Sequence, residues 1–386
     1  MRILCVVGAR PNFMKIAPII HEIRRHPDLT PILVHTGQHY DASMSDAFFR
    51  DLDIPEPDAH LRVGSGSHAA QTAGVMIAFE PVLSQQAPDV VVVVGDVNST
   101  LACALVAAKL GVPVAHVEAG LRSRDRTMPE EINRLATDAI ADILLTPSED
   151  ADANLRSEGV APERIRRVGN VMIDTLVQQR ARATPPSLWH EAGLAEGRYL
   201  YVTMHRPANV DTPEMLGHFL GIFGEIQRRV PVVWPLHPRT RARLAEFGLM
   251  DSARQWPGLV LGEPLPYRES LWLMASSAGV ITDSGGVQEE TTALGIPCLT
   301  ARPNTERPIT VTHGTNTLVG SDRERILCEV AAILDGRGKR GRTPPLWDGH
   351  AAERIIAALR ELVPACRAAR QSPAPAHAPR ANGEPG

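Results

Sequence analysis

Three carboxylates in the first half of the chain have the types and the spacing that proton transfer requires. Asp96 follows the apolar run Val90–Val94, and Glu118 follows a second strand-like run, Val112–Val117. Glu130 stands in the first turn of the next helical pattern. One acid at such a place can simply cap a helix or complement its dipole. Three acids on neighbouring strand ends exceed what capping requires, and crowding pushes the pKa values of carboxylates apart, which suits an acid–base pair.

Cationic side chains accompany these acids. Arg10 and Lys15 follow the first strand-like run, at the sheet edge where open α/β folds bind ligands, although two solvated cations are the plain alternative. This turn lacks the GxGxxG pattern, so binding of a nicotinamide dinucleotide by that route is not expected. Arg134 lies four residues after Glu130, so the two side chains can pair on the helix surface or face a ligand together.

A glycine turn in the second half of the chain predicts an anion site. Ser284, Gly285 and Gly286 link a strand-like run to a helix, and small residues there expose backbone N–H groups to a phosphate or diphosphate. A tight turn that needs glycine for its backbone angles is the structural alternative. Arg307 follows the next strand and can supply a cation, and Glu290, one turn into the helix, can accept hydrogen bonds from ribose hydroxyls.

Two histidines stand at the ends of two further strand-like runs in this half. His205 and His237 are each typical of a structural histidine when taken alone. Because the carboxyl ends of parallel strands share one edge of a sheet, both histidines are expected beside the glycine turn, where they form a polar rim.

The positions of these residues depend on strands and helices that alternate along the chain. Apolar runs without alternation, such as Val90–Val94, are typical of strands buried on both faces of a parallel sheet. Strand–helix–strand units that repeat in this way predict doubly wound α/β domains. Strands are expected over 3–7, 32–36, 90–94, 112–117 and 143–146, and again over 199–203, 230–235, 259–261, 280–282 and 297–300, with helices over 11–26, 69–86 and 99–110 in the first half.

The series of strands restarts after residues 181–197, a stretch whose run ATPPS is typical of a connection between domains. We therefore expect the α/β fold class with two Rossmann-like domains and a cleft between them: 1–170, which carries the acids, and 171–349, which carries the glycine turn. A helix over about 350–368 is expected to pack back on the first domain. Residues 371–386 are rich in Pro and Ala, lack periodicity and are expected to be disordered.

Composition excludes several classes of protein. The chain has 386 residues, of which 44% are hydrophobic and 22% charged, and its net charge of −4 is too balanced for a general nucleic-acid or membrane-surface binder. No apolar run is long enough to span a membrane, and the N-terminus lacks the layout of a signal peptide. The five cysteines are scattered and form no CxxC pair, which predicts reduced thiols in the cytoplasm and no metal site.

Nine segments of the chain carry motifs: GARPNFMKIAPI, HTGQHYD, GDVNST, HVEAGLRS, MPEEINR, GNVMIDT, HRPANVD, ITDSGGVQEE and TERP. As a set they closely resemble the motifs of the non-hydrolysing UDP-N-acetylglucosamine 2-epimerases, in order and with the expected spacing, along the whole chain except its tail. The resemblance implies a glycosyltransferase-B-like architecture, with the active site between two Rossmann-type domains. It also implies reversible conversion of UDP-GlcNAc into UDP-ManNAc, without a metal or nicotinamide cofactor, in a cytoplasmic homodimer that supplies ManNAc-type sugars for cell-surface polysaccharides.

The resemblance also assigns roles to residues. In the family, UDP leaves C1 as a proton leaves C2, and UDP re-adds to the bound 2-acetamidoglucal after protonation from the opposite face; this chemistry needs donors at the diphosphate and one acid and one base. In some bacterial members a second UDP-GlcNAc activates the enzyme, and Gln38 falls in the segment associated with that site. Asp96, Glu118 and Glu130 match the catalytic carboxylates; Arg10, Lys15 and Arg134 surround sugar and diphosphate; His205, Ser284, Gly285, Gly286, Glu290 and Arg307 match UDP-binding positions, which His237 borders.

One segment departs from the family pattern and keeps the substrate open. Many members have an acid directly before the Asn, whereas this chain has Pro207, Ala208 and Asn209. The chain therefore lacks any contact which that acid makes, and the allostery and substrate choice that depend on it can differ. A close branch of the family acts on UDP-sugars with a 3-acetamido group and a C6 carboxylate. A hydrolysing epimerase that releases UDP and ManNAc also fits the motifs. A glycosyltransferase of the same fold leaves the three acids without a role, and a catalytically silent sugar-nucleotide sensor has no need of them.

Overall fold

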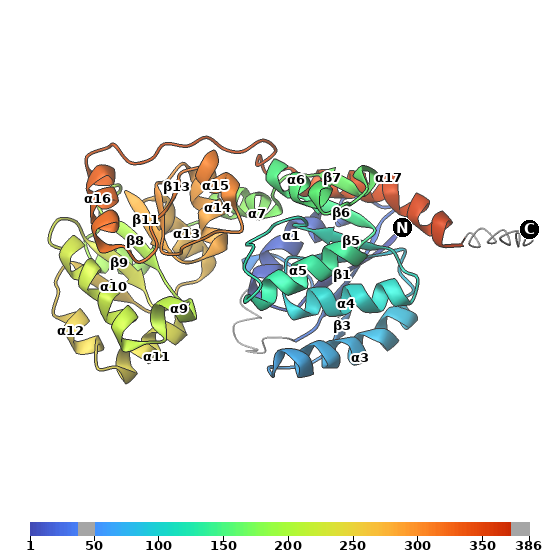
Figure 1. Cartoon of the computed structure of the whole chain (residues 1–386), viewed down its shortest axis with the longest axis horizontal. Helices are drawn as coiled ribbons and strands as arrows, with labels where there is room; N and C mark the ends of the chain where they lie inside the picture. Colours follow the sequence, from blue (N-terminus) through green and yellow to red (C-terminus); the bar gives the residue numbers. More distant parts are fainter. Residues whose placement is uncertain (38–50, 372–386) are drawn as a thin grey trace, which may run out of the picture.

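Two parallel β-sheets with helices on both faces build two lobes (Figure 1). The computed structural model describes residues 1–37 and 51–371, so Gln38 and residues 372–386 of the tail expected to be disordered lie outside the described residues. Gln371, the first residue of that tail, is instead the last residue of a helix. The first sheet has the order β3-β2-β1-β4-β5-β6-β7 and the second the order β10-β9-β8-β11-β12-β13. Both follow the doubly wound pattern, which confirms the predicted α/β class.

The first lobe contains the strands and helices up to residue 167. Its strands are β1 (Arg2–Val7), β2 (Thr30–His35), β3 (Ala59–His60), β4 (Val90–Val94), β5 (Val114–Val117), β6 (Ile143–Thr146) and β7 (Ile165–Arg167). Its helices are α1 (Arg10–Arg24), α3 (His68–Gln86), α4 (Asn98–Lys109), α5 (Pro129–Ile140) and α6 (Glu149–Ser157), with a 3₁₀ turn at Pro162–Arg164.

The second lobe repeats the arrangement. Its strands are β8 (Leu200–Thr203), β9 (Val232–Pro235), β10 (Leu259–Gly262), β11 (Gly279–Thr282), β12 (Cys298–Thr300) and β13 (Asn316–Leu318). Its helices are α8 (Ser187–Glu191), α9 (Pro207–Val210), α10 (Pro213–Ile226), α11 (Pro238–Glu246), α12 (Met250–Arg254), α13 (Tyr267–Ala275), α14 (Gly285–Leu294), α15 (Pro308–Thr312) and α16 (Arg323–Leu334).

The sequence pattern did not predict three strands at the edges of the sheets: β3, β7 and β13. They are two or three residues long, and all three contain polar residues, as in the segment Ile165–Arg167. A strand that pairs on one side only needs no continuous apolar run, so periodicity cannot identify it. The expected strands at Val90–Val94 and Ile143–Thr146 have the predicted bounds.

Helix α7 (Val171–Arg180) joins the lobes by packing into both cores. Val171 and Met172 belong to the core beneath β1 and α1, whereas Ile173 and Leu176 belong to the core beneath β8 and α13. The chain then crosses back from α16 to α17 (Ala351–Gln371), which lies against the first lobe (Figure 1). Ile355 of α17 is fully buried in the same core cluster as residues of α1.

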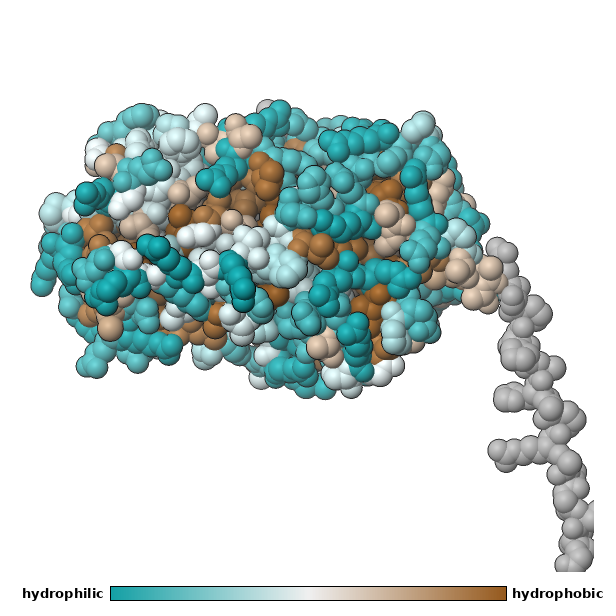
Figure 2. Space-filling view, turned by 90° about the horizontal axis from the view of Figure 1, so that it is seen from above, coloured by the Kyte–Doolittle hydropathy of each residue, from teal (hydrophilic) through white to brown (hydrophobic). Residues whose placement is uncertain are grey.

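The outer surface is mainly hydrophilic over both lobes in the view of Figure 2, with apolar side chains visible in smaller groups. Within residues 1–37 and 51–371, no helix has the length and apolar character needed to cross a bilayer.

Candidate active site

The carboxyl ends of the two sheets meet at one pair of side chains. Glu118 lies just after β5 of the first lobe, and Arg307 lies just before α15 of the second. The guanidinium Nη2 of Arg307 donates to Oε1 of Glu118 over 2.7 Å, and both side chains are buried. Because parallel strands point their carboxyl ends to one edge, this contact brings the candidate residues of both lobes together.

Glu118 has an unusual backbone and two cationic partners. Its φ of 71° is in the left-handed region, which costs a non-glycine residue free energy and concentrates at functional sites. Its other carboxylate oxygen forms an ion pair with Lys15 of α1. Gly95, which precedes Asp96, has φ 68°, a left-handed backbone that favours glycine, and an added Cβ there would lie 2.8 Å from the Lys15 Nζ. The predicted Lys15 and Glu118 therefore lie in direct contact.

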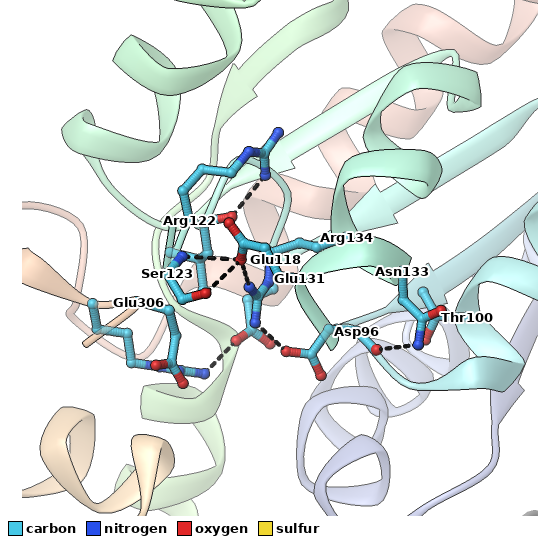
Figure 3. Close-up of polar contacts among 12 residues, drawn as sticks. Asp96, Thr100, Glu118, Arg122, Ser123, Glu131, Asn133, Arg134 and Glu306 are labelled. Carbon is cyan, nitrogen blue, oxygen red and sulfur yellow. Dashed lines mark hydrogen bonds and ion pairs between the residues drawn. The ribbon is translucent and has the colours of Figure 1, made fainter. Parts of the chain in front are cut away.

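Asp96 is held by Arg134, the buried cation of α5 (Figure 3). The two side chains are 2.5 Å apart, and that of Asp96 keeps 23% of its exposure. Burial raises the pKa of Asp96, but the positive charges of Arg134, Lys15 and Arg307 outweigh burial and hold the pKa below its usual range. Asp96 is therefore an ionised carboxylate at neutral pH.

Glu130 lies apart from this cluster and is exposed. Arg134 does not pair with Glu130, as the four-residue spacing allowed, but with Asp96 and Glu131. The reason is that Glu131 points inward, where it also accepts hydrogen bonds from the backbone and hydroxyl of Ser123 (Figure 3). Glu130 and Asp96 still line one cavity of about 270 Å³.

Arg307 is surrounded by acids. Besides Glu118, it pairs with Glu289 at 2.8 Å and with Glu306 at 2.5 Å. Burial raises the pKa of Glu289 to about 7, against the opposing effect of Arg307. For Glu306, the charges of Arg307 and Arg302 outweigh burial and hold its pKa well below the usual range. The guanidinium lies against Gly285, where an added Cβ would come within 2.6 Å of Nη1.

The glycine turn begins α14 as the sequence predicted. The backbone N–H of Ser284 donates to the Thr282 hydroxyl, and the Ser284 side chain makes no capping hydrogen bond to α14. Gly285 and Gly286 form the first turn of this helix. A helix N-terminus beside a buried Arg307 is suited to a diphosphate, because N–H groups and the positive end of the helix dipole face the same point.

The two histidines of the rim are neighbours. The rings of His205 and His237 are 5.2 Å apart. The fully buried Asp283 accepts the backbone N–H groups of His205 and Arg206, at 3.1 and 2.9 Å, and so ties the end of β8 to the end of β11. His237 precedes α11 and accepts the backbone N–H of Arg239.

Glu290 is buried one turn into α14, where the Tyr267 hydroxyl donates to its carboxylate over 2.7 Å. Burial raises its pKa to about 7. The folded chain therefore binds this proton more tightly than the unfolded chain does. The resulting stabilisation is complete below the unfolded pKa of about 4.5 and is lost as pH rises through about 7.

Because glutamine does not titrate, Glu290→Gln should gain stability relative to the original chain as pH rises. The difference in unfolding free energy should grow by about 2–3 kcal/mol between pH 5 and pH 8. Urea unfolding at both pH values measures it. The matched control is Glu324→Gln, which makes the same replacement at an exposed carboxylate of α16. A pH-independent difference for Glu290→Gln would contradict the raised pKa.

The structure thus brings most of the predicted residues to one place. Arg10 begins α1 at this edge, and Gln38 lies outside the described residues. Four acids that contact and position the predicted site residues were not predicted from the sequence. The doubled acids in PEE and QEE and the acid in TERP were the available sequence signals. The four acids are Glu131, Asp283, Glu289 and Glu306. Among the residues with described positions, no group of three or more His, Cys, Asp or Glu is arranged to hold a metal ion.

Comparison with known proteins agrees with this geometry. The family model described as UDP-N-acetylglucosamine 2-epimerase matches residues 21–360. The UDP-N-acetylglucosamine 2-epimerase of Methanocaldococcus jannaschii is 41% identical over 93% of this chain and 99% of its own length. The UDP-2,3-diacetamido-2,3-dideoxy-D-glucuronate 2-epimerase of Pseudomonas aeruginosa is 42% identical over 94% of this chain and its full length.

A solved structure shares the arrangement of both lobes. The crystal structure of the M. jannaschii UDP-GlcNAc 2-epimerase in complex with UDP-GlcNAc and UDP superposes with a TM-score of 0.84 and 40% identity, over 94% of this chain and all of that one. Sequence, fold and the acids facing a glycine turn therefore lead to one conclusion: the chain belongs to the UDP-N-acetylglucosamine 2-epimerase family.

Proposed function

We propose that this protein converts UDP-GlcNAc reversibly into UDP-ManNAc by inverting C2 of the sugar. The observation that carries the proposal is the direct contact of Glu118 with Arg307, which joins the acids of one lobe to the anion site of the other. The bond between C1 and the diphosphate oxygen breaks as a base takes the proton from C2, which leaves bound 2-acetamidoglucal and UDP. A proton then adds to the opposite face of C2, and UDP re-adds at C1.

Departure of UDP places negative charge on the diphosphate. Arg307 and the N-terminus of α14 supply positive charge and N–H donors at one side, and Lys15 supplies a second cation from α1. Fixed donors of this kind stabilise developing charge without reorganisation. Arg307 and Lys15 both pair with Glu118, so a bound diphosphate competes with this carboxylate for its cations.

The proton steps fall to Asp96, Glu118 and Glu130. Asp96 is ionised at neutral pH and can accept a proton. Glu130 lines the same cavity of about 270 Å³ and can approach the sugar from another side. Inversion at C2 requires groups on two faces of the ring, and two separated carboxylates supply them. Arg10, Arg134 and the rim of His205 and His237 hold sugar and nucleotide, and Glu290 accepts ribose hydroxyls.

A UDP-sugar with a 3-acetamido group and a C6 carboxylate is the second candidate substrate. The observation that favours it is the P. aeruginosa relative, which is as similar to this chain as the M. jannaschii protein and is named for such a sugar. Rates with the two substrates, each supplied alone, distinguish the candidates.

Proton NMR of UDP-GlcNAc with the enzyme in D₂O tests the proposal. We expect deuterium at C2 together with accumulation of UDP-ManNAc, because the removed proton exchanges with solvent before one is returned. Release of free ManNAc would indicate the hydrolysing reaction instead. Recovery of UDP-GlcNAc with no deuterium and no second product would contradict epimerisation.

The oligomeric state, the activator and the location belong to the same proposal. We infer a homodimer in the cytoplasm. The apolar side chain of Ile77 on α3, which keeps 74% of its exposure, is suited to an interface between two copies of the chain. Analytical ultracentrifugation would contradict the homodimer if only monomers were found.

A second UDP-GlcNAc that acts as an activator should give a sigmoidal dependence of rate on substrate concentration. A hyperbolic dependence would contradict activation by a second UDP-GlcNAc.

A further inference from the structure

A buried histidine that the proposed mechanism does not use lies directly behind the acids. His116 belongs to β5, two residues before Glu118, and its side chain has no exposed surface. Its Nδ1 is 2.6 Å from Oδ1 of Asp138 on α5, and its Nε2 is 2.8 Å from the carbonyl oxygen of Gly95. Gly95 is the residue before Asp96. One ring thus touches the segments that carry two of the three acids.

The partners of Asp138 establish that it is a carboxylate. Its Oδ2 accepts the backbone N–H of Gly120 over 3.0 Å and Nη1 of Arg122 over 2.7 Å. Burial raises the pKa of Asp138, but the charges and hydrogen bonds of His116 and Arg122 outweigh burial and lower the pKa. Both oxygens therefore face donors, and Asp138 has no proton to give.

This fixes the protons on the His116 ring. Nδ1 faces an anionic oxygen of Asp138, and Nε2 faces the carbonyl oxygen of Gly95, so both nitrogens face acceptors. A neutral imidazole has one N–H and one lone pair, and its lone pair would oppose an oxygen at hydrogen-bond distance in a site without water contact. Only the imidazolium satisfies both contacts.

The charges around the ring balance. Arg122 also binds Glu158 through two hydrogen bonds, of 2.8 and 2.6 Å. Two cations, His116 and Arg122, thus face two anions, Asp138 and Glu158. A buried charged group persists when its partners neutralise it and saturate its hydrogen bonds, as they do here.

The two anchored segments carry strained or special backbone. Gly95 has φ 68° and Glu118 has φ 71°. The Gly95 carbonyl is held by His116, and the Gly120 N–H is held by Asp138, so the pair clamps both turns. Relaxation of either turn would move an acid away from the sugar. A clamp of this kind is expected where backbone strain persists.

We propose that His116, kept as an imidazolium by Asp138, is a positioning residue that holds Asp96 and Glu118 in register while UDP leaves and returns. It acts through the peptide of Gly95 and touches no substrate. The proposal rests on the proposed epimerase function for its kinetic effect, whereas the protonation of the ring is independent of any reaction.

A pair of amide variants separates the two ring contacts. The amide nitrogen of His116→Gln can take the place of Nε2 and donate to Gly95, while that of His116→Asn can take the place of Nδ1 and donate to Asp138. We expect His116→Gln to keep most of kcat and His116→Asn to lose about tenfold to a hundredfold, since small misplacements of reacting groups have effects of that size. UDP affinity measured by calorimetry should be unchanged in both.

The matched control, Asp142, contacts the other end of the same strand from outside it. Asp142 accepts the backbone N–H of Val114, the first residue of β5. Asp142→Asn should leave kcat unchanged, although it perturbs the strand at its opposite end. Equal losses of kcat in both His116 variants, with a parallel loss of UDP affinity, would overturn the positioning role and indicate general disruption.

Nitrogen-15 NMR of the histidine-labelled wild-type chain tests the ring itself. The His116 signals, identified by their absence in His116→Gln or His116→Asn, should show both ring nitrogens protonated at neutral pH. A ring with one proton overturns the proposal. If neither variant folds, the wild type decides in the same way: two strongly deshielded, solvent-protected ring N–H protons support the imidazolium, and only one contradicts it. An inactive wild type with a doubly protonated ring would contradict the epimerase function and leave the imidazolium supported.

Discussion

Replacing Asp96, Glu118 or Glu130 by its amide should lower kcat at least a hundredfold. Asn and Gln keep the shape of the side chain but cannot transfer the proton, and general acid–base steps contribute about 10²–10⁴-fold. If the acids were only caps or dipole partners, each change would lower stability by about 1 kcal/mol at most and leave turnover intact. Steady-state kinetics, together with thermal unfolding, separates these cases.

The three variants should differ in their other properties. Glu118→Gln removes the carboxylate that pairs with Lys15 and Arg307, so both cations become available and UDP should bind at least as tightly as before. Asp96→Asn removes the partly exposed carboxylate that pairs with the buried Arg134. At least one variant should release 2-acetamidoglucal and UDP, because elimination can proceed when the return of the proton is impaired.

Combination and control variants test whether the acids act together. The losses should not add in double variants, since the groups serve one sequence of proton transfers. Glu80→Gln, at an exposed position of α3, is the matched control and should keep full turnover. If all three amide variants fold and retain more than half of the turnover, the carboxylate mechanism is wrong, and the protein is a UDP-sugar binder whose chemistry lies elsewhere.

Replacing Arg307 by Ala should weaken UDP binding and slow turnover together. A charge-assisted contact is worth about 1.5–3 kcal/mol, or roughly ten- to over a hundredfold in affinity. The effect on turnover should be at least as large, because the contact strengthens as charge develops on the leaving diphosphate. Calorimetry with UDP and steady-state rates measure the two effects.

The surroundings of Arg307 require a second variant. Its removal leaves Glu118, Glu289 and Glu306 without their shared buried cation, and an uncompensated buried charge destabilises strongly. Arg307→Lys keeps the charge but not the planar fork, so it should fold better and show an intermediate loss. Arg325→Ala, an exposed position at the start of α16, is the control. Unchanged UDP affinity in a folded Arg307 variant would remove this residue from the site.

The sequence alone determined the architecture and the edge at which the site lies. Apolar runs such as Val90–Val94 are buried on both faces, so their pattern identifies central strands without any knowledge of neighbours. Residues that directly follow such strands, Asp96 and Glu118 among them, must then lie at one edge of a parallel sheet. The motifs were specific enough to indicate the family, which the comparisons confirm.

Only the tertiary structure decided which charges meet. The four-residue spacing allowed Arg134 to pair with Glu130. The neighbouring Glu131 is buried instead, and Arg134 pairs with Glu131 and with Asp96. The contact of Glu118 with Arg307 joins residues 189 positions apart, and that of His116 with Asp138 depends on how α5 packs on β5. Local periodicity specifies which face of an element is buried, whereas the choice among several possible ion-pair partners depends on distances and desolvation set by packing of distant segments.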